Sequence, residues 1–188
     1  SIMTGLYPHT TGVIHINIPL LKKTPAIAEM VSSDYLCGYI GKWHLGDEII
    51  PQHGFTKWLS MEDNYRLFFT KREYLSRFSD YHNFLLGKGY TPDIEWVGER
   101  IFSREMTANL PEDLSKNTFL AREATRFIKE NNNHPFILYL AFMDPHSPLP
   151  THPSQMYSPN ELTTEPHFLK KPPENASQYH QQTAECYL

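Results

Sequence analysis

The chain has 188 residues, of which 40% are hydrophobic, and this is enough apolar material for one globular domain with a buried core. Its formal net charge of −4 comes from acids and bases that are mixed along the chain, so no basic stretch marks a nucleic-acid or anionic-membrane surface. The longest apolar run, residues 136–143, is far shorter than the roughly 20 residues of a membrane-spanning helix. Cys37 and Cys186 define neither a disulfide framework nor a metal site. We therefore expect no membrane span and no nucleic-acid partner, and a small-molecule partner fits the composition better.

The first part of the chain predicts a short helix followed by a buried strand. Residues 1–13 carry the Gly, Pro and Thr residues of a loop. Thr24 and Pro25 precede apolar residues at helical spacing, which predicts a helix over residues 25–33. The apolar string LCGYIG then predicts a strand that ends at Gly41 and delivers the next side chains to a loop.

The middle of the chain predicts an irregular stretch and then one clear helix. Residues 46–116 show no sustained period and are interpreted as an excursion from the core. Residues 115–130 have the apolar spacing of an amphipathic helix. Its inner face would carry Phe119, Leu120, Ala124, Phe127 and Ile128, and its outer face Arg122, Glu123, Arg126, Lys129 and Glu130.

The apolar run 136–143 is typical of a parallel strand covered on both faces, and it leads into the polar string DPHSP. Two strands that end in polar loops, with a helix between them, predict an α/β fold with a mostly parallel sheet flanked by helices. Beyond Pro148, a Pro-rich stretch to residue 173 predicts an ordered surface loop, and residues 176–188 predict a helix.

Candidate functional residues follow each of the two predicted strands. Lys42 and His44 are two positions apart after the first strand, so both side chains can point the same way and receive an anion between them. The competing interpretation is a surface lysine beside a packed histidine. His146 stands between two prolines after the second strand, where a structural role is as reasonable as a functional one. Because parallel strands end at the same edge, we expect Lys42, His44 and His146 to converge there, with residues 1–5 nearby.

Three strings together resemble type I sulfatases of the alkaline phosphatase superfamily. GYIGKWHLG closely resembles the second signature of that family, and TGLYPHTTGV is similar to the segment that follows its first signature. PHSP is similar to the family's Pro-His-x-Pro turn, and HGF at residues 53–55 also fits the family's order of elements. Residues 1–188 are thus identified as part of a sulfatase catalytic domain, an internal fragment truncated at both ends, whose residues 46–116 match no particular subfamily.

The resemblance implies a sulfuric ester hydrolase that uses formylglycine. A hydrated formylglycine would attack sulfur, Lys42 would hold the sulfate, His146 would contact the sulfate and protonate the leaving oxygen, and His44 would remove a hydroxyl proton so that sulfate is expelled. The formylglycine would lie upstream of Ser1, and the calcium ligands upstream of Ser1 and downstream of Leu188, so the metal has no ligand in this chain. We therefore expect the 188 residues alone neither to hydrolyse sulfate esters nor to hold calcium tightly.

Two other functions remain open at this point. One is a phosphodiesterase or phosphonate monoester hydrolase of the same superfamily, and the other is a non-catalytic sulfatase-like binding protein. The substrate would be a small-molecule or carbohydrate sulfate ester, and the resemblance implies a periplasmic, secreted or lysosomal protein. Seven aromatic residues between Tyr65 and Phe84 are interpreted as packing rather than as a sugar-binding rim. The other histidines are expected to be structural or solvated and to form no zinc site, namely His9, His15, His82, His134, His152, His167 and His180.

Overall fold

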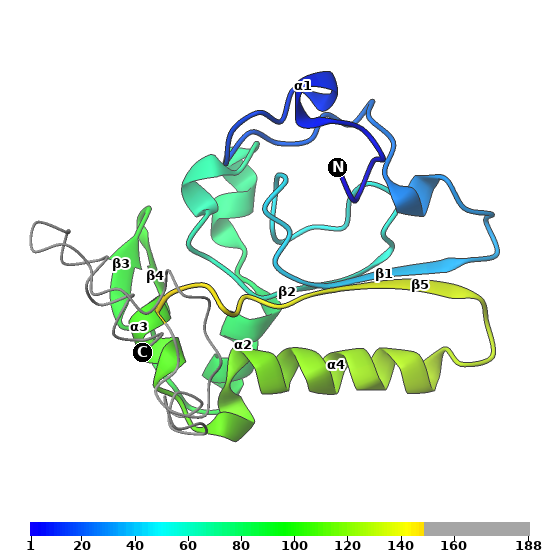
Figure 1. Ribbon diagram of the computed structural model, residues 1–188. Coiled ribbons are helices and arrows are strands. Elements are labelled where there is room, and N and C mark those ends of the chain that lie inside the picture. The colour runs from blue at the N-terminus through cyan, green and yellow to red at the C-terminus, as the bar shows by residue number, and fades with distance from the viewer. Residues whose placement is uncertain (149–188) are drawn as a thin grey trace, which may run out of the picture. The chain divides into compact units, whose positions relative to one another are not determined.

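The computed structural model describes residues 1–148, and a three-stranded parallel sheet lies at its centre (Figure 1). The strands are β1 (Leu36–Gly41), β2 (Lys57–Ser60) and β5 (Phe136–Ala141), in the order β2-β1-β5. β1 and β5 pair in register from Leu36 opposite Phe136 to Gly41 opposite Ala141. The predicted α/β fold with a mostly parallel, helix-flanked sheet is confirmed, and β1 has the bounds that its sequence predicted.

Side chains of β1 alternate between two apolar layers because successive strand residues point to opposite faces of a sheet. Ile40 packs in the larger cluster with α4 (Lys116–Glu130) and α2 (Asp80–Gly87). Cys37 and Tyr39 pack on the other face, in a cluster that includes Met3, Trp43 and Phe55. Figure 1 accordingly shows α2 and α4 on one side of the sheet and the N-terminal segment on the other.

Helix α4 follows the predicted amphipathic pattern with two corrections. The Ser115 side chain caps the helix by accepting a hydrogen bond from the backbone N–H of Thr118. Ile128, expected inside, is exposed, whereas Glu123, expected outside, is buried. At about 100° per residue, position 123 falls between Phe119 and Phe127, inside the arc of buried positions. Position 128 falls outside that arc of buried positions. The Glu123 carboxylate is compensated by ion pairs with Arg122 and Arg126.

The helix predicted over residues 25–33 is wrong in extent, because only the 3-10 turn η1 (Ile27–Glu29) forms. The Glu29 carboxylate accepts a hydrogen bond from the Ala26 N–H at 2.8 Å. Only Ala28 of this turn packs into the core. A single turn therefore satisfies the local backbone, and too few apolar side chains find a packing partner to extend it.

The interpretation of residues 46–116 as an excursion from the core is also wrong. Met61, Tyr81, Leu85 and Phe102 from this stretch are buried in the larger cluster. Its elements are too short to show a period, which explains why the pattern concealed them. Besides β2 and α2, the elements of this stretch are η2 (Arg66–Phe68), η3 (Arg72–Ser76), β3 (Ile94–Trp96), β4 (Glu99–Ile101), α3 (Arg104–Ala108) and η4 (Glu112–Leu114). Near the N-terminus, the short helix α1 (Pro8–Thr11) is the only element before η1.

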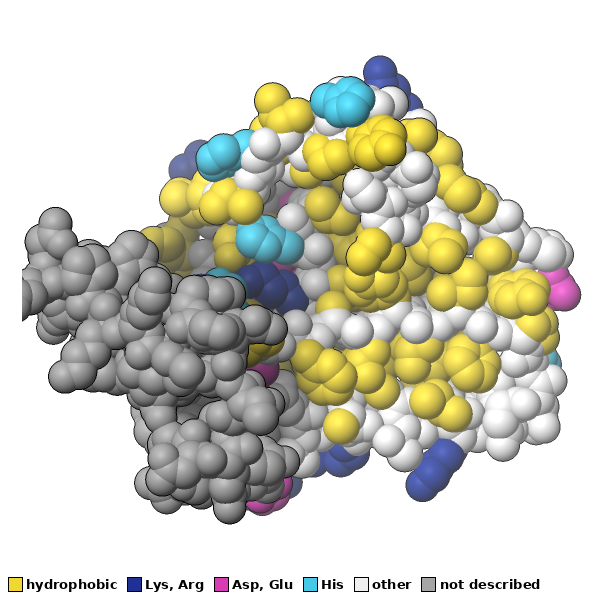
Figure 2. Space-filling model, viewed as in Figure 1, with side chains coloured by type: hydrophobic (Ala, Val, Ile, Leu, Met, Phe, Trp, Pro, Cys, Tyr) yellow, Lys and Arg dark blue, Asp and Glu magenta, His cyan; other side chains and the backbone are white. Residues whose placement is uncertain are grey.

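Strand β5 is shorter and less buried than its apolar run predicted. It ends at Ala141, and all six of its residues are half-buried, because within residues 1–148 it pairs on one side only. Figure 2 shows hydrophobic side chains at the surface along the strands of Figure 1. Within the described residues, no helix is both long enough and apolar enough to cross a membrane. The predicted loop and helix beyond Pro148, together with Cys186, His152, His167 and His180, lie outside those residues.

Candidate active site

The carboxyl ends of β1 and β5 lie against each other at the edge where the candidate residues begin. The Lys42 N–H donates to the Ala141 carbonyl at 3.1 Å, which extends the ladder by one bond. Gly41 has a φ of 120°, and a Cβ at this position would lie 1.9 Å from the Ala141 carbonyl oxygen. Only glycine allows the two strand ends to approach this closely. Lys42 and residues 142–146 therefore leave the sheet side by side.

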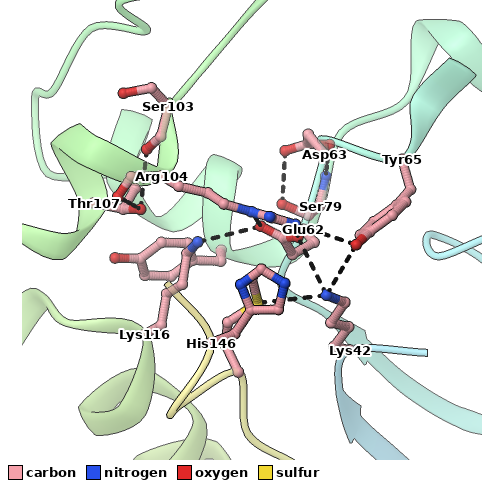
Figure 3. Close-up of polar contacts among 12 residues, drawn as sticks. Lys42, Glu62, Asp63, Tyr65, Ser79, Ser103, Arg104, Thr107, Lys116 and His146 are labelled. Carbon is pink, nitrogen blue, oxygen red and sulfur yellow. Dashed lines mark hydrogen bonds and ion pairs between the residues drawn. The ribbon is translucent and has the colours of Figure 1, made fainter. Parts of the chain in front are cut away.

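The Lys42 side chain is mostly buried, and its ammonium group forms only a long ion pair with the Glu62 carboxylate (Figure 3). Its Nζ is 3.2 Å from the Tyr65 hydroxyl and 3.7 Å from the Met143 sulfur. The nearest carboxylate oxygen, Glu62 Oε2, is 4.0 Å away, which is longer than a hydrogen bond. Lys42 thus keeps a positive charge and donor capacity for an incoming anion.

Glu62, at 2% exposure, is the buried carboxylate of this region. Arg104 donates to its two oxygens at 2.6 Å and 3.3 Å, and Lys116 donates at 3.3 Å. Burial alone would raise the pKa of Glu62, but the charges of Lys116 and Arg104 outweigh it and lower that pKa. Burial lowers the pKa of Lys116 against the opposing effect of Glu62. The cluster therefore contains one stable carboxylate surrounded by Lys42, Arg104 and Lys116.

His44 is held by its backbone in a left-handed conformation, with φ of 54°. The buried Glu48 carboxylate accepts the N–H of Trp43 at 2.9 Å and that of His44 at 2.8 Å. The imidazole ring lies 4.3 Å from the Tyr65 ring, and its buried Nε2 has no hydrogen-bond partner in the described part of the chain. Burial and the charge of Lys42 lower the pKa of His44, so the neutral ring is favoured.

His146 is exposed beside this cluster. Its backbone N–H donates to the Met143 carbonyl at 3.0 Å, and Met143 in turn contacts Lys42. Ring atom Nδ1 lies 2.7 Å from the Ser147 carbonyl, so Nδ1 carries the hydrogen and Nε2 remains available. Figure 3 shows the ring near the Lys42 ammonium group, and the charge of His146 also acts on His44. Lys42, His44 and His146 thus lie at one edge of the sheet, as their positions after the strands led us to expect.

The N-terminal residues and a small pocket complete this region. Met3 packs with Trp43, the residue between Lys42 and His44, in the smaller apolar cluster. The pocket is lined in part by Asn17 and His44, whose buried Oδ1 and Nε2 atoms lack hydrogen-bond partners within residues 1–148. Its walls are formed by Asn17, Pro19, His44, Gly46, Glu48, Tyr65 and Phe68.

Sequence reasoning did not find Glu62, Tyr65, Arg104 and Lys116, which surround Lys42 in the structure. Tyr65 was interpreted as packing, yet its hydroxyl contacts the Lys42 ammonium group. A signal existed in the string SMED, where two acids directly follow a short apolar stretch, but nothing local indicated which cations they meet.

The remaining described histidines are structural or solvated, but His82 is buried and not at the surface where it was expected. His9 and His15 are exposed, and His134 is exposed as well. His82 was expected at the surface, but it is buried, with Nδ1 3.3 Å from the Asp63 carboxylate and its ring stacked on Phe78. Within residues 1–148, no three His, Cys, Asp or Glu side chains come together as metal ligands. Calcium therefore has no candidate ligand set here, and its ligands stay a prediction about other parts of the protein.

Glu48 should make folding depend on pH. Burial raises its pKa to about 7 despite the two backbone hydrogen bonds that oppose the shift. The folded protein then binds this proton more tightly than the unfolded chain, whose carboxyl has a pKa near 4.5. The stabilisation that this bound proton gives the folded state is fully present below about pH 4.5. It is lost as the pH rises through 7. Relative to Glu48→Gln, we expect wild-type stability to increase by on the order of 3 kcal/mol as pH falls across this window.

Denaturant unfolding of both complete proteins across that pH range checks this expectation. A stability difference that does not change with pH would show that Glu48 does not titrate there.

Comparisons with known proteins identify the family of the chain. The family model described as Sulfatase matches residues 1–188. An ulvan-active sulfatase from Formosa agariphila is 25% identical over 182 residues, which cover 91% of this chain and 30% of that protein. The chain thus spans under a third of that relative's length. A solved structure titled "Crystal structure of Ps i-CgsB" is 26% identical and covers 78% of this chain and 34% of that one, with a TM-score of 0.43.

Proposed function

The chain belongs to the sulfatase family, and on that premise we propose that the complete protein hydrolyses the sulfate ester of a small molecule or carbohydrate. The observation that carries the proposal is the Lys42 ammonium group, which lies at the edge of the sheet from which His44 and His146 also extend, without a hydrogen-bonded carboxylate. A mostly buried cation in this state favours an anionic ligand, because water competes weakly for it there.

Each candidate residue has a role that its geometry supports. Lys42 would hold a sulfate oxygen by a charge-assisted hydrogen bond. His146 would donate a proton from Nε2 to the bridging oxygen, and it must do so as imidazolium because Nδ1 already donates to Ser147. His44, favoured as the neutral ring, would accept a proton from a hydroxyl group beside the sulfate. A formylglycine hydrate and a calcium ion elsewhere in the protein would supply the nucleophilic hydroxyl and additional positive charge.

Turnover by the complete protein tests the proposal. We expect faster hydrolysis of 4-nitrophenyl sulfate than of bis(4-nitrophenyl) phosphate, because the chain belongs to the sulfatase family. Faster turnover of the phosphodiester would favour a phosphodiesterase of the same superfamily. Binding of inorganic sulfate without any turnover would favour a non-catalytic binding protein. Export to the periplasm, the cell exterior or the lysosome stays a prediction from family resemblance.

The acid limb of the pH profile should report His44. Because burial and Lys42 lower the pKa of His44 from 6.5, the neutral base persists to lower pH than an ordinary histidine allows. We therefore expect kcat/KM to fall only below about pH 6.5 through this group. An inflection of the kcat/KM profile near pH 7 would come from Glu48, and it should be missing in the Glu48→Gln variant. A single acid limb above 6.5 that survives this substitution would exclude His44 as the base.

A further inference from the structure

Glu62 has two carboxylate oxygens, and three cations surround them. Arg104 Nη2 lies 2.6 Å from Oε2, the same oxygen that faces Lys42 at 4.0 Å. Arg104 Nε and Lys116 Nζ each lie 3.3 Å from Oε1. Both oxygens therefore have closer partners than Lys42. The carboxylate attracts the Lys42 ammonium group but makes no hydrogen bond with it.

Tyr65 lies between the two cations that face Oε2. Its hydroxyl is 3.2 Å from Lys42 Nζ and 3.4 Å from Arg104 Nη2, and its oxygen can accept from both. Its ring faces both cations, at 4.7 Å from Lys42 and 5.6 Å from Arg104, and it also contacts the His44 ring. Tyr65 thus contacts the Lys42 ammonium group while Arg104 holds the carboxylate (Figure 3).

We propose that Arg104 is a positioning residue for sulfate binding: it occupies Glu62, so that Lys42 stays 4.0 Å from this carboxylate and is not drawn into a hydrogen bond with it. This inference rests on the proposed function, because it requires Lys42 to be the sulfate-binding group. A lysine hydrogen-bonded to a buried carboxylate would have its charge compensated, and an incoming sulfate would have to displace that partner. With Arg104 on Oε2, the carboxylate keeps Lys42 in place and leaves its ammonium hydrogens available.

The charge balance around Glu62 supports this division of roles. Lys116, a residue of α4, donates to the other oxygen of Glu62. Its side chain is 15% exposed and lies on the helix side of the carboxylate. Arg104 comes from the first turn of α3, which Ser103 caps by accepting the Met106 N–H. Asp93 in turn accepts both the backbone N–H and the hydroxyl of Ser103, so the residue before Arg104 is held on two sides. The backbone that carries Arg104 is therefore fixed by its own segment, and the guanidinium is held by Glu62 and Tyr65.

A double-mutant cycle on the complete protein tests the inference. In Arg104→Gln, Oε2 loses its closest cation, and Lys42 should move onto it. We expect inorganic sulfate, titrated calorimetrically, to bind about tenfold to a hundredfold more weakly, with a similar rise in KM for 4-nitrophenyl sulfate and a smaller change in kcat. Adding Glu62→Gln removes the carboxylate that captures Lys42. The double variant should therefore recover sulfate affinity to within about threefold of wild type.

Three further variants sharpen the cycle. Arg104→Lys keeps a cation on Oε2 and should bind sulfate much as wild type does. Arg72→Gln removes an exposed arginine from η3 and serves as the matched control for lost positive charge. Tyr65→Phe removes the hydroxyl between Lys42 and Arg104, so it should weaken sulfate binding by a few-fold and recover in combination with Glu62→Gln. If thermal denaturation shows that Arg104→Gln is not folded, sulfate binding by Tyr65→Phe with and without Glu62→Gln provides the test instead.

The outcomes separate the inference from the proposed function. Sulfate binding by Arg104→Gln as tight as wild type, or no recovery in the double variant, would overturn the role of Arg104. A complete protein that binds sulfate but does not hydrolyse aryl sulfates would contradict the proposed function, while the sulfate titrations still decide the role of Arg104. A complete protein that binds no sulfate would overturn both.

Discussion

Replacing Lys42 with alanine in the complete protein is expected to lower kcat/KM for 4-nitrophenyl sulfate by about 10²–10³-fold. Lys42 supplies the cation that contacts the sulfate in the proposed mechanism, and loss of one preorganised donor to a developing charge typically has this cost. The Lys42 side chain is only 11% exposed, so water replaces its ammonium group poorly.

The Lys42→Ala variant should still fold, because Glu62 retains Arg104 and Lys116 as partners. The alanine also keeps the backbone bond to Ala141 that extends the sheet. The matched control is Lys71→Ala, which removes an exposed lysine whose only close acid in the described residues is Glu73, itself exposed. Steady-state kinetics and thermal denaturation of both variants provide the measurement. A folded Lys42→Ala protein with wild-type kcat/KM would exclude Lys42 as the sulfate-binding group.

Replacing His146 with alanine should reduce turnover by an amount that depends on the leaving group. For alkyl or sugar sulfates, whose alcohols leave poorly, we expect a loss of about 10²–10⁴-fold, because proton donation by a positioned acid contributes this much. 4-Nitrophenolate leaves without full protonation, so its sulfate ester should lose much less. The ring is exposed, and its side-chain hydrogen bond is to the carbonyl of the neighbouring Ser147, so its removal should not affect folding.

Rates for a series of substituted phenyl sulfates provide the measurement for His146. The dependence of rate on leaving-group pKa should become steeper in His146→Ala than in wild type. His134→Ala, which removes another exposed histidine, is the matched control. Equal losses across the whole series would argue that His146 positions the substrate and does not act as the acid.

The local parts of the structure were predictable from short strings. LCGYIG has the bounds of β1, and the apolar spacing of residues 115–130 predicted α4 to within one residue of its start. Both elements bury most of their apolar side chains, so their periodicity survives in the sequence. Lys42, His44 and His146 were predicted because the strings GYIGKWHLG and PHSP resemble sulfatase motifs and each lies at the end of a predicted strand, where a parallel sheet leads polar side chains to one edge.

The partners of Lys42 were decided by the tertiary structure alone. Glu62 meets Arg104 across 42 positions and Lys116 across 54, and Lys42 meets Met143 across 101. The elements that bring them together, a four-residue strand, a five-residue helix and several single turns, are too short to leave a period that sequence reasoning can use. An ion pair also depends on distances of a few ångström between side chains and on their burial, and neither is encoded in nearby residues. The sequence by itself therefore predicted which residues would bind an anion, whereas only the packing of residues 57–116 against α4 and β1 decided which charges surround the lysine proposed to bind it.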